Sequence, residues 1–317
     1  MSESGLGANS FVVDLGTAPL GPVVVVNLRG GLGNQLFQYA CGLAIVIDCG
    51  LPLRLAVDMV GMAATPREPE IEDVFDLEVE RVSRQEMLRL LGRMRAPPQV
   101  RLLLEKPWFT WARGDRFLIE ERVAEVPDLS AVSNEGIYLH GYWQSEQYFV
   151  RHAETIRKAL RFSRPLHRIS AEVARRIKAR PSASLHVRRG DYFASAKARA
   201  VHGVCDLDYY LRAITRLNED VPGLRWFAFS DEPEWVENVL RPYCTELEIV
   251  RHNQGKDSCY DMHLMSLCSH HVIANSSFSW WGAWLNASPD KIVIAPQRWF
   301  ADGRDCRAVT PPAWLRL

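Results

Sequence analysis

The sequence predicts an α/β protein with two Rossmann-like halves, each a mostly parallel β-sheet covered by helices, facing a cleft between them. Short apolar, β-branched segments alternate with amphipathic segments along the chain, which is the pattern of strand–helix–strand units. The length of 317 residues is typical of two domains. Glycines or polar residues follow several predicted strands, at the edge where open α/β sheets bind ligands.

The totals exclude some classes of protein. Lysine plus arginine and aspartate plus glutamate both number 38, so the formal net charge is zero and nucleic acid is not an expected partner. No apolar run reaches about 18 residues, so no transmembrane segment is expected. Residues 1–20 lack the pattern of a signal peptide and are expected to form a loose leader. Seven cysteines without metal-ligand spacing are typical of a reducing compartment, which predicts a cytoplasmic protein.

The first half begins with a strand, a glycine loop and a helix. Val23–Val26 is a continuous β-branched run, typical of a buried parallel strand. A helix is expected from about Gln35 to Asp48, followed by a second strand at Leu51–Val57. Further expected elements, after a less regular stretch, are a helix at Gln85–Met94, a strand at Ile137–Ser145 with polar and aromatic groups at its exit, and a helix at Gln147–Leu160.

Strands and helices alternate more regularly in the second half. The break at Arg164-Pro165 divides the chain into expected domains of 21–162 and 163–317. The expected strands are Ala183–Val187, Leu224–Phe229, Glu246–Val250, His271–Ala274 and Ile292–Ala295. The expected helices are Ile169–Ala179, Leu207–Leu217, Cys259–Cys268 and Phe278–Leu285. Because parallel strands place their carboxyl ends on one edge, the polar residues after these strands are expected to share one space.

The loop after the first strand has two interpretations. Gly31 and Gly33 would let the backbone approach a ligand closely, and Asn34 and Gln35 would present amides at a helix start that favours anions. The alternative is that the glycines only allow a tight turn between strand and helix. A dinucleotide fingerprint would need a third glycine where Leu36 stands, so a dehydrogenase is disfavoured.

The most distinctive stretch follows the strand that ends at Val187. Arg188 and Arg189 come directly after it, before Gly190 and Asp191. Two adjacent guanidiniums beside a flexible glycine suit a diphosphate or another oxyanion. The alternative is a surface turn in which Arg189 pairs with Asp191.

Other strand ends and one helix add polar groups to the same space. Ser230–Glu232 follow one strand, and Ser276 and Ser277 start a helix whose N-terminal N–H groups favour anions. Asp261 lies among apolar helix residues, where a carboxylate is costly to bury without a partner. A purine edge with two adjacent N–H donors, as in guanine, would satisfy both its oxygens. The alternative is an ordinary surface acid or a partner of the helix dipole.

Five segments of the chain are familiar as a set. They are Arg29–Ala40, Tyr138–Phe149, His186–Tyr192, Val201–Cys205 and Asn275–Gly282. In this order the chain resembles the bacterial α-1,2-fucosyltransferases of glycosyltransferase family 11. His186–Tyr192 matches the H-x-R-R-G-D motif that this family shares with α-1,6- and protein O-fucosyltransferases.

The resemblance implies a GT-B architecture, in which two Rossmann-like domains face a cleft and the second domain holds the nucleotide. It implies inverting transfer of L-fucose from GDP-β-L-fucose to the 2-hydroxyl of a galactose-containing acceptor, in surface polysaccharide synthesis. The first domain is then mainly the acceptor side. The alternative is a transferase or binding protein for another GDP-sugar. The acceptor's identity and a peripheral contact with the inner membrane are left open.

The resemblance also implies roles for single residues. It places Arg188 on the β-phosphate, Ser277 on the diphosphate, and His186 and Asp261 on guanine. The whole expected donor site comprises Gly31, Gly33, Asn34, Gln35, His186, Arg188, Arg189, Asp261, Ser276 and Ser277.

No metal and no cofactor are expected, since GDP-fucose is a co-substrate. Asp206 and Asp208 have the D-x-D spacing with which some glycosyltransferases bind Mn²⁺ or Mg²⁺. They directly precede a predicted helix, so one of them is expected to cap it instead. The two arginines already supply the positive charge that a leaving diphosphate needs.

The general base is left open. The glutamate that serves as base in the α-1,6 relatives has no counterpart, because Ala196 stands at the matching position. Asp191 and His202 are the candidates, with Arg188 as the catalytic cation. Asp191 could instead only shape its loop by pairing with Arg189, and His202 could bind the acceptor without transferring a proton.

Overall fold

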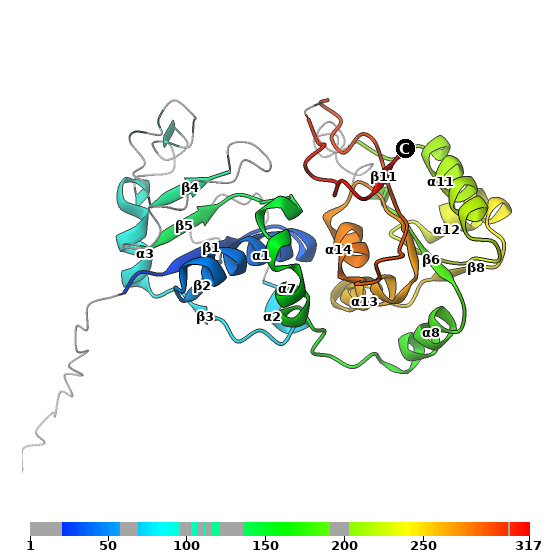
Figure 1. Ribbon diagram of the computed structural model, residues 1–317, viewed down its shortest axis with the longest axis horizontal. Coiled ribbons are helices and arrows are strands. Elements are labelled where there is room, and N and C mark those ends of the chain that lie inside the picture. Colours follow the sequence, from blue (N-terminus) through cyan, green and yellow to red (C-terminus); the bar gives the residue numbers. More distant parts are fainter. Residues whose placement is uncertain are drawn as a thin grey trace, which may run out of the picture.

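The computed structural model describes residues 21–57, 69–95, 100, 103–104, 106, 109, 111, 116–120, 136–190, 203–303 and 305–317. These residues form two β-sheets with helices packed against them (Figure 1). One sheet has five strands in the order β3-β2-β1-β5-β4, and the other has six in the order β11-β10-β9-β6-β7-β8. Neighbouring strands in both sheets run parallel, which confirms the predicted α/β class.

The five-stranded sheet comes from the first half of the chain. Its strands are β1 (Val24–Leu28), β2 (Leu53–Val57), β3 (Glu80–Arg81), β4 (Phe117–Ile119) and β5 (Ile137–His140). The central strand β1 is buried along its whole length, which explains its run of valines. Val26 lies level with Leu55 of β2 and Leu139 of β5.

The longest helix, α1 (Leu32–Cys49), packs directly on β1. A Cβ on Gly42 would lie 2.2 Å from Cγ2 of Val26, so this close packing requires glycine. Gly50 ends the helix in a left-handed conformation with φ 70°. The other helical segments of this half are α2 (Ile71–Val74), α3 (Arg84–Leu91), η1 (Gly92–Arg95), η3 (Glu146–Tyr148), η4 (Val150–His152) and α7 (Ala153–Ala159).

The six-stranded sheet comes from the second half of the chain. Its strands are β6 (Ser182–Val187), β7 (Arg225–Ser230), β8 (Leu247–Val250), β9 (His270–Val272), β10 (Val293–Ala295) and β11 (Leu315–Arg316). Its helical segments are α8 (Arg168–Lys178), α11 (Leu207–Asp220), α12 (Pro233–Trp235), the π-helical turn η5 (Val236–Leu240), η6 (Arg241–Tyr243), η7 (Gly255–Ser258), α13 (Cys259–Leu267) and α14 (Ser277–Leu285). No helix in the ranges given above is long and apolar enough to cross a membrane.

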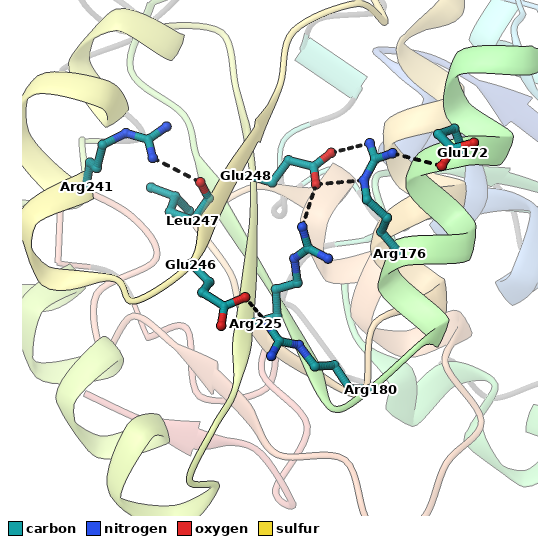
Figure 2. A network of polar contacts seen from close by, with 8 residues as sticks. All are labelled: Glu172, Arg176, Arg180, Arg225, Arg241, Glu246, Leu247 and Glu248. Carbon is teal, nitrogen blue, oxygen red and sulfur yellow. Dashed lines mark hydrogen bonds and ion pairs between the residues drawn. The ribbon is translucent and has the colours of Figure 1, made fainter.

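An ion-pair network fixes α8 to the outer strands of this sheet (Figure 2). Arg176 of α8 donates to the two carboxylate oxygens of Glu248 on β8 at 2.9 and 2.6 Å. Arg225 of β7 donates to the same carboxylate at 3.3 Å. Arg176 also pairs with Glu172, one turn earlier in α8, at 3.3 Å. The network sets the position of α8 along β8, and with it the position of the residues at the start of α8.

One aromatic core joins the two halves of the chain. Phe37 of α1 and Phe149 pack against Trp280, Trp281 and Trp284 of α14, and all five rings are at most 2% exposed. The ring centroids of Phe37 and Trp280 are 4.4 Å apart, and those of Phe149 and Trp281 are 5.6 Å apart. Burial of so much aromatic surface holds α1 and α14 together between the sheets (Figure 1).

The main difference from the predicted elements lies after β5. This strand ends at His140, and Trp143 has a left-handed backbone with φ 55°. The Glu120 carboxylate accepts hydrogen bonds from the N–H groups of Tyr142 and Trp143 at 2.9 and 2.7 Å, which holds this turn. In place of the predicted helix Gln147–Leu160, the chain forms two 3₁₀ turns followed by the short α7. The short strands β3, β4 and β11 were not predicted, and the other predicted elements agree in type and place.

Candidate active site

Two helix N-termini meet between the sheets. Gly31 has no side chain to cap α1, and the side chain of Ser276 makes no capping hydrogen bond to α14 within the described part of the chain. A Cβ on Gly33 would lie 2.5 Å from the carbonyl carbon of Ser277 and 2.6 Å from the backbone nitrogen of Phe278. The first turns of α1 and α14 are therefore in direct contact. The N–H groups at a helix N-terminus favour anions, so this junction is suited to one.

This contact changes the interpretation of the glycine loop. Gly33 allows the two helices to touch, which neither of the two interpretations of the loop had included. Gln35 is 1% exposed, donates to the Gly30 carbonyl oxygen at 3.0 Å and accepts from two backbone N–H groups near the start of α2. Its geometry is that of a residue which holds the loop. Donor contacts of Gly31, Gly33, Asn34 and Gln35 stay predictions. The Asn34 side-chain oxygen accepts from another side chain at 2.8 Å.

His186 lies near the carboxyl end of β6 and is 5% exposed. Its Nδ1 has no hydrogen-bond partner among the residues that the structure describes. Burial, together with the positive charge of Arg188, lowers the pKa of His186 to about 3, so the ring is neutral at physiological pH. Buried polar atoms are normally paired, so a bare ring nitrogen at this sheet edge is suited to a ligand hydrogen bond.

Asp231, just after β7, shapes the loop that follows β6. Its two oxygens accept hydrogen bonds from the N–H groups of Arg189 and Gly190, both at 3.0 Å. Nε of Arg188 lies 3.5 Å from Oδ2 of the same carboxylate. One side chain thus turns the backbone and orients the first arginine. The sequence indicated polar residues at Ser230–Glu232 but did not assign this role, because it requires knowledge of the neighbouring strand.

Arg189 packs against α12. Its Nε pairs with Glu232 at 3.3 Å, and its guanidinium carbon lies 4.2 Å from the centre of the Trp235 ring. This geometry gives Arg189 a role in holding the loop. Asp191 and His202 lie outside the described residues, so their roles, and a pair between Arg189 and Asp191, stay predictions.

Asp261 lies in the first turn of α13 and is partly buried. Burial raises the pKa of its carboxyl to about 7, although a hydrogen bond from Nδ2 of Asn253 at 2.7 Å acts in the opposite direction. The Asn253 oxygen accepts in turn from Nε2 of His167 at 2.9 Å and from Oγ of Ser170 at 3.1 Å, both at the start of α8. Asn253 was not predicted from the sequence, although its position shortly after β8 was a usable signal.

The D-x-D pair has ordinary structural roles. Asp206 caps α11 by accepting from the N–H of Tyr209 at 2.8 Å, as predicted, and Asp208 pairs with Arg212 at 2.8 Å. Considering only the described residues, no group of three or more histidine, cysteine, aspartate or glutamate side chains is arranged to hold a metal ion.

The structure brings most of the remaining predicted residues to one edge of the second sheet. The ring centroids of His186 and Phe278 are 6.1 Å apart, so the end of β6 lies beside the start of α14. Arg188 follows β6, and Ser277 begins α14. Asp261 lies on α13, which packs closely on α14. A cation, a helix N-terminus, a neutral imidazole and a carboxylate are the groups that a nucleoside diphosphate requires.

A family profile and two related proteins all identify this chain as similar to one family of glycosyltransferases. The sequence profile of Glycosyl transferase family 11 matches residues 119–317. The alpha-1,2-colitosyltransferase of Escherichia coli is 32% identical over 302 residues, which cover 93% of this chain and 99% of that protein. The O-antigen biosynthesis glycosyltransferase WbnK of Escherichia coli is 32% identical over 314 residues, which cover 92% of this chain and 99% of that protein.

Solved structures identify the architecture. The fucosyltransferase NodZ from Bradyrhizobium aligns with a TM-score of 0.51 at 14% identity, covering 83% of this chain and 92% of that one. A mutant of Arabidopsis thaliana FUT1 in complex with GDP aligns with a TM-score of 0.51 at 12% identity, covering 86% and 70%. Together with the two parallel-sheet α/β units, this confirms the predicted GT-B fold. The profile covers more than half of the sequence and the two relatives align almost end to end, so the chain belongs to glycosyl transferase family 11.

Proposed function

We propose that the protein transfers L-fucose from GDP-β-L-fucose to the 2-hydroxyl of a galactoside, with inversion and without a metal ion, in surface polysaccharide synthesis. The observation that carries this proposal is the junction of the β6 end with two helix N-termini, which is suited to a diphosphate. The two relatives support the linkage and the pathway, because one is an α-1,2-transferase and the other acts in O-antigen biosynthesis.

The donor is held at its two ends by different groups. Arg188 and the N-terminus of α14 at Ser277 bind the diphosphate, since both present positive charge to it. Asp261 accepts hydrogen bonds from the two adjacent N–H donors on the guanine edge, and His186 supplies its free ring nitrogen to the base. The raised pKa of Asp261 fits this role, because an unliganded carboxylate at this depth lacks the partners that guanine provides.

The reaction is a direct displacement at the anomeric carbon of the sugar. As the bond to the diphosphate breaks, negative charge builds on GDP, and Arg188 with the α14 N-terminus stabilises it. Asp231 holds the arginine in place during this step. A base removes the proton from the attacking hydroxyl, and Asp191 and His202 are the two candidates.

A second candidate donor follows from the relatives. The Escherichia coli α-1,2-colitosyltransferase is similar to this chain over nearly its whole length. Colitose is a fucose that lacks the 3-hydroxyl, so both sugars fit the same diphosphate and guanine contacts. The alternative function is therefore α-1,2 transfer of colitose or of another sugar from GDP.

A donor panel tests the proposal. GDP-fucose, GDP-colitose and GDP-mannose are each incubated with β-galactosides and EDTA, and the product is quantified by mass spectrometry. We expect transfer from GDP-fucose in EDTA; loss of activity in EDTA would contradict the metal-free mechanism. Arg188→Ala should nearly abolish turnover and GDP binding, whereas the control Arg212→Ala on the surface of α11 should not. Asp191→Asn and His202→Gln are compared in the same way. The substitution that removes the general base should abolish turnover and leave GDP binding unchanged.

A further inference from the structure

An arginine at the carboxyl edge of the first sheet is not used by the mechanism above. Arg29 follows β1, and its Nη1 lies 3.2 Å from Nε2 of His140 at the end of β5. Nδ1 of His140 lies 3.4 Å from the carboxamide of Asn27 in β1. Asn27 and His140 are 1% and 5% exposed, so this row of three side chains starts in the core and ends at the partly buried Arg29.

The hydrogen-bonding chemistry of these three side chains determines which ring nitrogen of His140 carries the hydrogen. Arginine can only donate, so Nε2 of His140 is the unprotonated nitrogen and Nδ1 carries the hydrogen. The carboxamide atom that faces Nδ1–H must then be the oxygen of Asn27. The amide of Asn27 is then turned so that its oxygen accepts from Nδ1–H, and its nitrogen takes the buried position that has no partner among the described residues. A neutral histidine, fixed in one tautomer, thus orients the guanidinium of Arg29.

The guanidinium of Arg29 has no carboxylate partner among the described residues. Within the part of the chain that the structure describes, Arg29 forms no ion pair with a carboxylate, whereas Arg188 and Arg189 have Asp231 and Glu232. Its guanidinium carbon lies 4.9 Å from the centre of the Tyr142 ring, which is 40% exposed. The remaining N–H donors of Arg29 are therefore available beside an accessible aromatic ring.

The backbone places this group close to the donor site. Gln38 of α1 accepts from the N–H of Arg29 at 3.0 Å and donates to the Gly141 carbonyl at 3.0 Å, so it ties the ends of β1 and β5 to α1. Gly33, five residues earlier in α1, contacts the start of α14. Arg29 therefore lies at the same junction as the diphosphate site, but on the side of the first sheet.

We propose that Arg29 is an acceptor-binding residue, and that His140 is a positioning residue which aims its guanidinium. This inference rests on the proposed function, because the second substrate of a sugar transfer must approach the donor from the opposite side. The ligand class is a neutral hexose with two adjacent hydroxyls, which match the fork of a guanidinium, and Tyr142 offers an aromatic face beside it.

Kinetics of matched variants test this. Arg29→Gln should raise the KM for the galactoside at least about tenfold, as for the loss of hydrogen bonds from a charged donor, with the Kd of GDP within about twofold of wild type. Arg29→Lys keeps the charge but not the fork, and should also raise KM. The control Arg151→Gln, which loses an exposed pair with Asp48, should change neither quantity. His140→Phe should also raise the KM for the acceptor. The double variant should be no worse than Arg29→Gln alone, because each substitution removes the same positioned guanidinium.

The alternative outcomes are distinct. If Arg29→Gln weakens GDP binding about tenfold and leaves the acceptor KM unchanged, Arg29 serves the donor and the proposal is wrong. If neither quantity changes, or if the two variants have additive effects, the proposal is also wrong. If the wild type transfers no sugar to any galactoside, the proposed function fails separately. In that case, saturation-transfer NMR tests whether lactose binds at Arg29 without any transfer. A lactose signal with the wild type that Arg29→Gln abolishes supports the acceptor site, and signals that are equal in both proteins, or absent from both, contradict it.

Discussion

Asp261→Asn should make the protein more stable and the donor site weaker. The carboxyl of Asp261 has a pKa of about 7 and is therefore ionised at pH 8, and its only hydrogen bond to a described side chain comes from Asn253. An asparagine side-chain oxygen can accept that same hydrogen bond. The substitution therefore removes a buried charge with little change of shape, and it places an N–H₂ group where guanine needs an acceptor.

The magnitude follows from the pKa. Burial raises the pKa of Asp261 from 3.8 to about 7. Each pKa unit corresponds to about 1.36 kcal/mol, so ionisation of this carboxyl costs at most about 4 kcal/mol of folding free energy. We expect the variant to gain about 1–4 kcal/mol at pH 8, which is a rise in Tm of several degrees. The loss of hydrogen bonds to a charged acceptor should weaken GDP binding by about 10- to 150-fold.

The gain in stability should depend on pH. The pKa of Asp261 is higher in the folded than in the unfolded state, so its contribution to stability is present below about pH 4 and is lost as the pH rises through about 7. The difference between wild type and variant should therefore grow from pH 5 to pH 8 and then stay constant. Urea unfolding followed by tryptophan fluorescence at these pH values, and calorimetry with GDP, measure the two effects.

Asp208→Asn is the matched control, since Asp208 is an exposed carboxylate on α11 that pairs with Arg212. It should leave GDP affinity unchanged and produce no comparable gain in stability at pH 8. The reasoning is refuted if Asp261→Asn is less stable than wild type at pH 8, or if it binds GDP as tightly.

Three further predictions concern the surroundings of the site. Gly33→Ala would place a Cβ 2.5 Å from the backbone of α14, so it should lower the free energy of unfolding by about 1–3 kcal/mol and reduce turnover. The control Gly21→Ala, whose Cβ would have no atom within 4 Å, should have neither effect, and thermal unfolding compares the two variants. Asp231→Asn should lower turnover about 10- to 100-fold with the far-UV circular dichroism unchanged, because the carboxylate that orients Arg188, the proposed diphosphate-binding cation, is lost. Full activity would remove Asp231 from the proposed mechanism. Asn253→Leu removes a hydrogen bond that lowers the pKa of Asp261, so the pH midpoint of GDP binding should move upward in calorimetry from pH 6 to pH 8, and an unchanged midpoint would contradict the link.

Much of the fold could be predicted because its strands have strong local signals. The run at Val23–Val26 is β-branched and buried on both faces, and the strand ending at Val187 is followed by a glycine-containing turn. The strands that were missed are two or three residues long, as at Glu80–Arg81, and carry no periodic pattern. The early end of the strand after Ile137 depends on Glu120, a partner that local sequence does not reveal.

The site was predicted less completely, for a related reason. The sequence placed His186 and Arg188 at a strand end, and the structure has them there because their positions depend only on their own strand. Gly33 contacts α14, Gln35 accepts hydrogen bonds near the start of α2, and Arg189 pairs with Glu232 beside α12. The sequence predicted none of these contacts, because each partner lies far along the chain. The spacing of residues gave no signal for such long-range contacts.

The most direct test of the account is the structure of the product. The protein is incubated with GDP-fucose and a β-galactoside, and the purified product is analysed by two-dimensional NMR. The account predicts a single new α-configured fucose joined to O2 of galactose. Transfer to another hydroxyl, a β-linkage, or no transfer from any GDP-sugar would contradict it.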